Sequence, residues 1–173
     1  MGISARFAEL LAVVALPALG AGSEATKIWF DDPFFQLTHD IVECPEPRGP
    51  YITEEEALRE SHHRAERGLR CHLEGRCKYS SSYQYDPEIA DNIRKAVRDH
   101  RMIVPRSTLW VLVQGRRVWI YGCVPGGYRP GALREQLRKI PDLEVATEEL
   151  RIGARGTVDY RMRSISTPAL PPR

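Results

Sequence analysis

Several short motifs that mark catalytic and metal-binding proteins are missing from this chain. No Cys-x-x-Cys occurs, and His62, His63 and His72 lack the four-residue spacing that places two metal ligands on one helical face. No serine lies in a Gly-x-Ser-x-Gly context. Because no acid–base pair or catalytic triad is recognisable either, the sequence predicts no catalytic site, no metal centre and no other cofactor.

The chain also lacks a hydrophobic run that would span a bilayer comfortably. The apolar segment Leu10–Leu19 is too short, follows Arg6, and ends near the small residues Ala18 and Gly20. This arrangement is typical of a secretory signal peptide, which we expect to cover residues 1–20, with a buried N-terminal helix as the alternative. No cysteine follows the cleavage region, so a lipid anchor is not indicated, and we expect the mature chain to be exported.

Four cysteines are present, Cys44, Cys71, Cys77 and Cys123. In an oxidising compartment this even number predicts two disulfides, for which three pairings are possible. We favour Cys71–Cys77 because Gly75 allows the segment between them to close a short loop, and this leaves Cys44–Cys123. A zinc or copper site is the alternative, without the ligand spacing to support it.

The stretch Leu109–Val124 predicts the centre of the fold. Leu109–Gln114 and Val118–Val124 are rich in β-branched and aromatic residues and are separated by a turn around Gly115, which is typical of a β-hairpin. Alternation predicts a valine face and an aromatic face, both apolar. The valine face should pack on helices; the aromatic face needs a cover, which we expect from the N-terminal half, with a partner or second subunit as the alternative. The valine face comprises Leu109, Val111, Val113, Val118, Ile120 and Val124, and the aromatic face comprises Trp110, Leu112, Trp119, Tyr121 and Cys123.

Helices are predicted on both sides of this hairpin in the sequence. Thr53 to Glu56 forms a capping box that starts a helix over about residues 53–68, with Leu58 on its apolar face and Arg64 facing water. Asp86 is a predicted N-cap for a second helix that runs to about His100. Residues 131–140 predict a third helix.

The remaining segments complete the predicted order. Residues 143–152 suggest a last strand, interrupted or bulged at residues 147–149, and this gives the order α-β-β-α-β. The aromatic segment around Asp31, Asp32 and Pro33 is predicted to be extended and pinned by its aromatic side chains, or alternatively to dip into a membrane. Residues 157–163 are predicted to form an edge strand or to belong to a basic, partly disordered tail over residues 154–173.

Charge is distributed unevenly along the chain. Residues 21–84 carry 8 Lys and Arg against 12 Asp and Glu, whereas residues 85–173 carry 16 against 10. Within the basic half, Arg94, Arg98 and Arg101 follow one another at a spacing that places them on one helical face. A basic stripe of this kind binds phosphate headgroups, although pairing with Asp91 or Asp99 is the common alternative.

An α-β-β-α-β unit with a Val-x-Ile-x-Gly-x-Val strand after a glycine turn resembles the BON domain of bacterial exported proteins. The resemblance covers about residues 85–153. It implies an α+β fold in which a three-stranded sheet packs on two helices. From the four cysteines we expect that an N-terminal helix and loop extension, residues 21–84, precedes this unit and is tied to it by disulfides. The matching positions are Leu109–Val113, Gly115, Val118, Ile120, Gly122 and Val124 in the hairpin, Leu133 and Leu137 in the helix, and Val145, Leu150 and Ile152 in the last strand.

The resemblance also implies a function. It indicates a non-catalytic protein in the periplasm of a Gram-negative bacterium, or secreted, that binds anionic phospholipid surfaces or envelope proteins and supports envelope integrity under osmotic stress. The residues expected to contact lipid are Arg94, Arg98 and Arg101. The alternatives are a periplasmic enzyme whose site is assembled from distant segments, and a KH-like module, although the Gly-x-x-Gly loop that such a module needs is missing and we expect no nucleic-acid partner.

Overall fold

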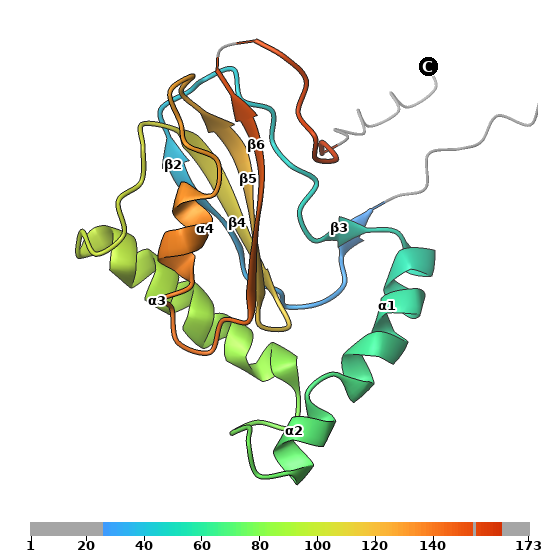
Figure 1. Ribbon diagram of the computed structural model, residues 1–173. Coiled ribbons are helices and arrows are strands. Elements are labelled where there is room, and N and C mark those ends of the chain that lie inside the picture. Colours follow the sequence, from blue (N-terminus) through green and yellow to red (C-terminus); the bar gives the residue numbers. More distant parts are fainter. Residues whose placement is uncertain (1–25, 154, 164–173) are drawn as a thin grey trace, which may run out of the picture.

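The hairpin lies inside a four-stranded sheet that is the backbone of a mixed α+β protein (Figure 1). The computed structural model describes residues 26–153 and 155–163, so the predicted signal peptide and the end of the tail lie outside the described residues. The strands are β1 (Lys27–Ile28), β2 (Phe34–His39), β3 (Tyr51–Ile52), β4 (Thr108–Gln114), β5 (Arg117–Val124) and β6 (Val145–Ile152). The helices are α1 (Glu54–Glu66), α2 (Leu69–Leu73), α3 (Asp86–Arg98) and α4 (Ala132–Leu137), with a 3₁₀ turn at Ser82–Tyr85.

The predicted order of helix, two strands, helix and strand is present as α3, β4, β5, α4 and β6. The sheet order is β2-β4-β5-β6, with β5 and β6 parallel and the other neighbours antiparallel. The expectation of three strands was wrong, because β2 from the aromatic N-terminal segment adds a fourth. The sequence of β2 does not show the alternation of apolar and polar residues that is typical of a strand. Phe34 and Phe35 are both apolar although they point to opposite faces, and a bulge follows Gln36.

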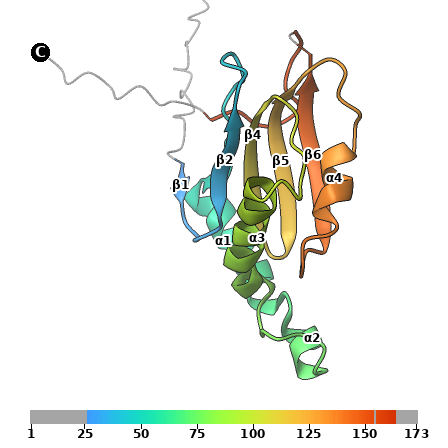
Figure 2. The ribbon, with the colours of Figure 1, turned by 90° about the vertical axis from the view of Figure 1, so that its left-hand side faces the viewer.

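Helices α3 and α4 lie side by side on one face of the sheet, and α1 lies on the other side (Figures 1 and 2). We call the pair α3 and α4 the helical layer. Its buried residues, such as Ile89, Ile93 and Leu133, pack with the valine face of the hairpin, as predicted. Gly122 lets the strands approach each other, because a Cβ at this position would overlap the carbonyl oxygen of Thr108.

The last strand is continuous, so the predicted interruption at residues 147–149 was wrong. Glu148 points to the helical face, where its carboxylate accepts hydrogen bonds from the backbone N–H groups of Gly131 (2.7 Å) and Arg134 (2.7 Å) and from the Tyr128 hydroxyl (3.0 Å). The acid therefore satisfies donors at the start of α4 without leaving the strand.

The aromatic face of the hairpin is covered by the same chain, as expected. Cys44 pairs with Cys123, with 5.8 Å between their Cα atoms, and this pairing holds the segment after β2 against β5. Tyr160 from the C-terminal segment is buried there, packs edge-on against Tyr121 with ring centroids 5.6 Å apart, and donates a hydrogen bond to the carbonyl of Pro45 (2.6 Å). The described part of the tail forms an isolated bridge, Pro47 with Met162, and no edge strand of the main sheet.

Helix α1 begins with the predicted capping box, but its orientation differs from the prediction. Leu58 is 62% exposed, whereas Arg64 is largely buried between the rings of Phe30 and Tyr83, with its guanidinium carbon 3.9 Å and 3.7 Å from the ring centroids. Arg64 also pairs with the buried carboxylate of Asp32. Arg64, and not the predicted apolar face with Leu58, therefore holds α1 against the rest of the protein.

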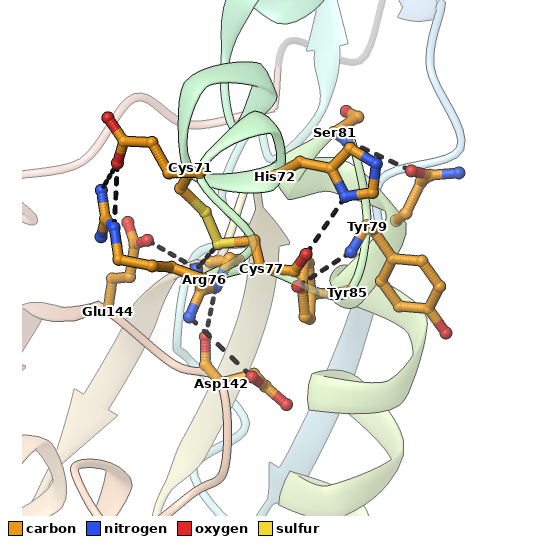
Figure 3. Close-up of a disulfide and its surroundings, with 12 residues drawn as sticks. Cys71, His72, Arg76, Cys77, Tyr79, Ser81, Tyr85, Asp142 and Glu144 are labelled. Atoms are coloured by element: carbon orange, nitrogen blue, oxygen red, sulfur yellow. Dashed lines mark hydrogen bonds and ion pairs between the residues drawn. A yellow bond between two sulfur atoms is a disulfide. The ribbon is translucent and has the colours of Figure 1, made fainter.

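The second predicted pair, Cys71–Cys77, connects α2 to the segment that follows it, with 5.3 Å between the Cα atoms (Figure 3). His72 hydrogen-bonds through its Nδ1 to the carbonyl of Cys77 inside the loop that this pair closes (3.1 Å). Arg116, from the hairpin turn, pairs with Glu144 (2.9 Å) beside the loop. The structure therefore contains both predicted cysteine pairs.

The start of α3 corrects one further prediction. Asp86 is the first helical residue and not the N-cap, and its buried carboxylate accepts the backbone N–H groups of Gly115 (2.5 Å) and Arg116 (2.7 Å). Burial raises the pKa of Asp86 to about 6, although the two hydrogen bonds oppose this. Asp86 thus connects α3 to the hairpin turn.

Candidate functional site

The three arginines predicted to contact lipid are not equivalent in the structure. Arg94 lies on the side of α3, where its guanidinium stacks on the ring of Phe35 (3.8 Å to the centroid) and pairs with Asp91 (2.9 Å). Phe35 belongs to β2, which sequence reasoning did not identify as a strand. Arg94 therefore helps to hold the helix on the sheet.

Arg101 is also separated from the predicted stripe. Helix α3 ends at Arg98, two residues earlier than expected, and His100 adopts a left-handed conformation (φ 55°) in the turn that follows. Arg101 lies in this turn and pairs with Asp99 (3.2 Å). The i, i+4, i+7 spacing therefore does not bring the three arginines onto one helical face. Of these three, Arg98 alone is exposed, helical and without an ion pair in the described part of the chain.

A basic surface nevertheless covers the helical layer. Its exposed acids are neutralised by cations from its edges: Asp91 by Arg94, Asp99 by Arg101, Glu135 by Arg129 (2.7 Å), and Glu88 by Lys78 (3.8 Å). Five exposed cations of this layer form no ion pair within residues 26–153 and 155–163. One of them, Arg134, lies in the first turn of α4 with its guanidinium beside Gly131. We call the other four the basic patch: Lys95 and Arg98 on α3, and Arg138 and Lys139 at the end of α4.

The packing of the two helices explains how the patch arises. In α3 the buried positions include Ile89, Ile93 and Ala96, so Lys95 and Arg98 point away from the sheet. In α4 the buried Leu137 likewise leaves Arg138 exposed. The patch was missed in the sequence because its members come from two helices separated by the hairpin, and only the packing of both helices on one sheet face brings them to one surface.

The opposite side of the sheet contains a cavity of about 330 Å³. Tyr121, Glu149 and Asp159 line it together with Arg48 and Arg161. Burial and then the neighbouring Asp159 raise the pKa of Glu149, and burial raises the pKa of Tyr121. Arg48 and Arg161 both pair with Glu56 (3.1 and 3.3 Å). In this cavity, segments that are distant in the sequence bring titratable groups together.

Among the described residues, the side chains of Tyr121, Glu149 and Asp159 line this cavity together but form no hydrogen bond with one another. The enzyme alternative stays a hypothesis. In the described ranges, no group of three or more His, Cys, Asp or Glu residues is arranged to hold a metal ion.

Among residues 26–153 and 155–163, none of the helices is long and apolar enough to cross a membrane. Comparisons of the chain with models of protein families, with curated proteins and with solved structures found no match.

Proposed function

We propose that this protein is an exported, non-catalytic envelope protein whose helical layer binds anionic phospholipid surfaces. The observation that carries the proposal is the basic patch: four exposed cations on one side of the molecule, in a layer whose acids are already paired with other cations. Each cation near an anionic membrane contributes about 1 kcal/mol of attraction. With four such cations, the helical layer is the surface that we expect to bind phosphate headgroups.

Two other features support the proposal. The cysteine pairs Cys44–Cys123 and Cys71–Cys77 fit an oxidising compartment such as the periplasm. The α3-β4-β5-α4-β6 order fits the resemblance of residues 85–153 to the BON domain, which implies association with phospholipid surfaces or envelope proteins. Support of envelope integrity under osmotic stress is part of the same proposal.

The structure changes which residues should be tested. Removing Arg94 would also remove its contacts with Phe35 and Asp91, so a loss of binding would be mixed with a loss of stability. The better variant replaces the whole basic patch with glutamine, because these side chains are exposed and form no ion pair with any residue that the structure describes. Arg98 is the only member that the sequence-based prediction included.

The experiment is sedimentation of the protein with vesicles that contain phosphatidylglycerol, compared with vesicles of phosphatidylcholine alone. Wild type should bind the anionic vesicles, and its affinity should fall as salt is added. The patch variant should bind up to about a thousandfold more weakly. A control with the same change in net charge replaces four exposed cations elsewhere, Lys27, Arg59, Arg70 and Arg117.

The control variant should bind almost as well as wild type. If the patch variant and the control lose affinity equally, the helical layer is not the interface. If wild type binds no anionic vesicle, the lipid hypothesis itself fails.

A further inference from the structure

An apolar groove of about 360 Å³ opens at one end of the helical layer. It lies between the turn that follows α3, the loop after β5, and the first turns of α4. The apolar residues that line it include Ile103, Pro105, Pro125, Tyr128, Ala132 and Leu133. No carboxylate lines it among the described residues.

The groove has fixed walls. The amide side chain of Gln136 accepts a hydrogen bond from the Ile103 N–H (2.7 Å) and donates one to the Ile103 carbonyl (2.9 Å), which ties the turn after α3 to α4. The Tyr128 hydroxyl accepts the Leu133 N–H (3.0 Å) and donates to Glu148 (3.0 Å), which fixes the loop side. A groove that is already formed loses little conformational entropy when a ligand enters.

One side chain at this groove is unusually exposed for its type. Ile103 is 77% exposed although both of its backbone polar groups are held by Gln136. The isoleucine is therefore presented to solvent beside the groove on a restrained backbone. Burying it together with the groove lining would be favourable for any apolar ligand.

The charges around the groove select among apolar ligands. Arg129 lines the groove, where it is paired with Glu135 (2.7 Å). Arg106 directly follows the lining residue Pro105, is exposed, and has no ion pair in the part of the chain that the structure describes. Lys139 of the basic patch lies in the turn that ends α4, where its backbone N–H donates to the carbonyl of Gln136 (3.1 Å), another residue that lines the groove. A ligand that combines an apolar chain with an anionic head matches this arrangement.

We infer that the groove holds one acyl chain of an anionic membrane lipid whose headgroup contacts the adjoining cations. This inference rests on the proposed function and deepens it, since it adds a site for a single lipid molecule to a surface that attracts a membrane. Ile103 and Ala132 contact the chain, and the cations contact the phosphate.

The test uses alkyl phosphates below the concentration at which they form micelles, titrated into the intact protein and followed by calorimetry and by backbone amide chemical shifts. Affinity should rise roughly fourfold per methylene from hexyl to decyl phosphate, as long as the added carbons enter the groove. Propyl phosphate, which is almost only a headgroup, and decyltrimethylammonium, which has the opposite charge, should bind much more weakly. The shifts should concentrate at residues 103–105 and 125–136.

Two variants address the groove directly. Ile103→Ser removes the exposed apolar side chain and should weaken decyl phosphate binding about tenfold. Ala132→Trp fills the groove from a partly exposed position and should abolish the dependence on chain length. Leu58→Ser is the matched control, because Leu58 is equally an exposed aliphatic residue (62%) but lies on α1, on the other side of the sheet.

The outcomes separate this inference from the proposed function. If Ile103→Ser and Ala132→Trp bind decyl phosphate as wild type does, or if chain length has no effect, the inference is overturned, whereas vesicle binding through the basic patch would stand. If wild type binds no anionic vesicle but binds decyl phosphate through Ile103, the proposed function fails and the ligand class of the groove is supported. A dimer in sedimentation velocity that Ile103→Ser dissociates would assign the groove to a second copy and overturn the inference.

Discussion

Removing the two disulfides one at a time should have very different effects on stability. Cys44 and Cys123 are 79 residues apart in sequence, whereas Cys71 and Cys77 are 6 apart. A cross-link restricts the unfolded chain more when it closes a longer loop. By the chain-entropy relation, the long bridge contributes about 4.5 kcal/mol and the short one about 2 kcal/mol at 25 °C.

The structure adds a reason for the same ranking. Cys123 is fully buried on the aromatic face, where its pairing with Cys44 holds the cover of the sheet in place, whereas the Cys71–Cys77 loop lies at the end of the α1–α2 arm. We expect Cys44→Ala/Cys123→Ala to lose at least twice as much free energy of unfolding as Cys71→Ala/Cys77→Ala.

Urea unfolding of the two double variants and of wild type, followed by tryptophan fluorescence and by circular dichroism, measures both losses. In the Cys44→Ala/Cys123→Ala protein, the two probes should also cease to coincide if the N-terminal cover opens before the sheet. Equal losses, or a greater loss for the short loop, would refute the view that the N-terminal half and the hairpin form one unit through Cys44–Cys123.

Three other predictions concern single residues. Arg64→Ala should lower the free energy of unfolding by about 3 kcal/mol, because it leaves the buried Asp32 carboxylate without its guanidinium partner, and hydrogen exchange should localise the effect to α1. Gly122→Ala should cost about 3 kcal/mol in urea unfolding, since the added methyl group meets the Thr108 carbonyl and the residue has a φ of 138°; a neutral result would contradict the close approach of the strands. The pKa of Asp86 is raised to about 6 from an ordinary value of 3.8, so its contribution to stability is full below pH 4 and is lost as the pH rises through 6. Wild type should therefore gain up to about 3 kcal/mol relative to Asp86→Asn between pH 7 and pH 4 in denaturant titrations, and a pH-independent difference would refute the shift.

Much of the fold could be predicted from the sequence because local patterns coincide with tertiary packing. The valine face of the hairpin, the capping box at Thr53 and the spacing in α3 and α4 each depend on the period of one element. The pairing of Cys44 with Cys123 followed by elimination once the short loop had been assigned.

The errors occurred where a polar or aromatic side chain has a tertiary partner. The sequence pattern of α1 predicts that Arg64 is exposed to solvent, but in the structure it packs against Phe30 and Tyr83 and pairs with Asp32. The sequence pattern predicts that Glu148 interrupts the last strand, but in the structure its carboxylate accepts hydrogen bonds from backbone N–H groups at the start of α4. No single-sequence pattern encodes a partner that is far away along the chain.

The candidate site shows the same limit. The helical period placed Arg94, Arg98 and Arg101 together, but it could not show that Phe35 stacks on Arg94 or that α3 ends at Arg98. The basic patch depends on α4 lying beside α3, which is a property of the sheet that both helices cover.

The most direct test of the central claim is to determine which face of the protein meets an anionic membrane. Amide signals of the isotope-labelled protein can be recorded with phosphatidylglycerol-containing bicelles that carry a small fraction of lipid with a paramagnetic headgroup. We predict that broadening concentrates on residues 95–106 and 127–139, the exposed side of the helical layer and the groove beside it. Broadening centred on α1 and the cavity around Tyr121, or spread evenly over both faces, would contradict the assignment of the helical layer as the membrane-binding surface.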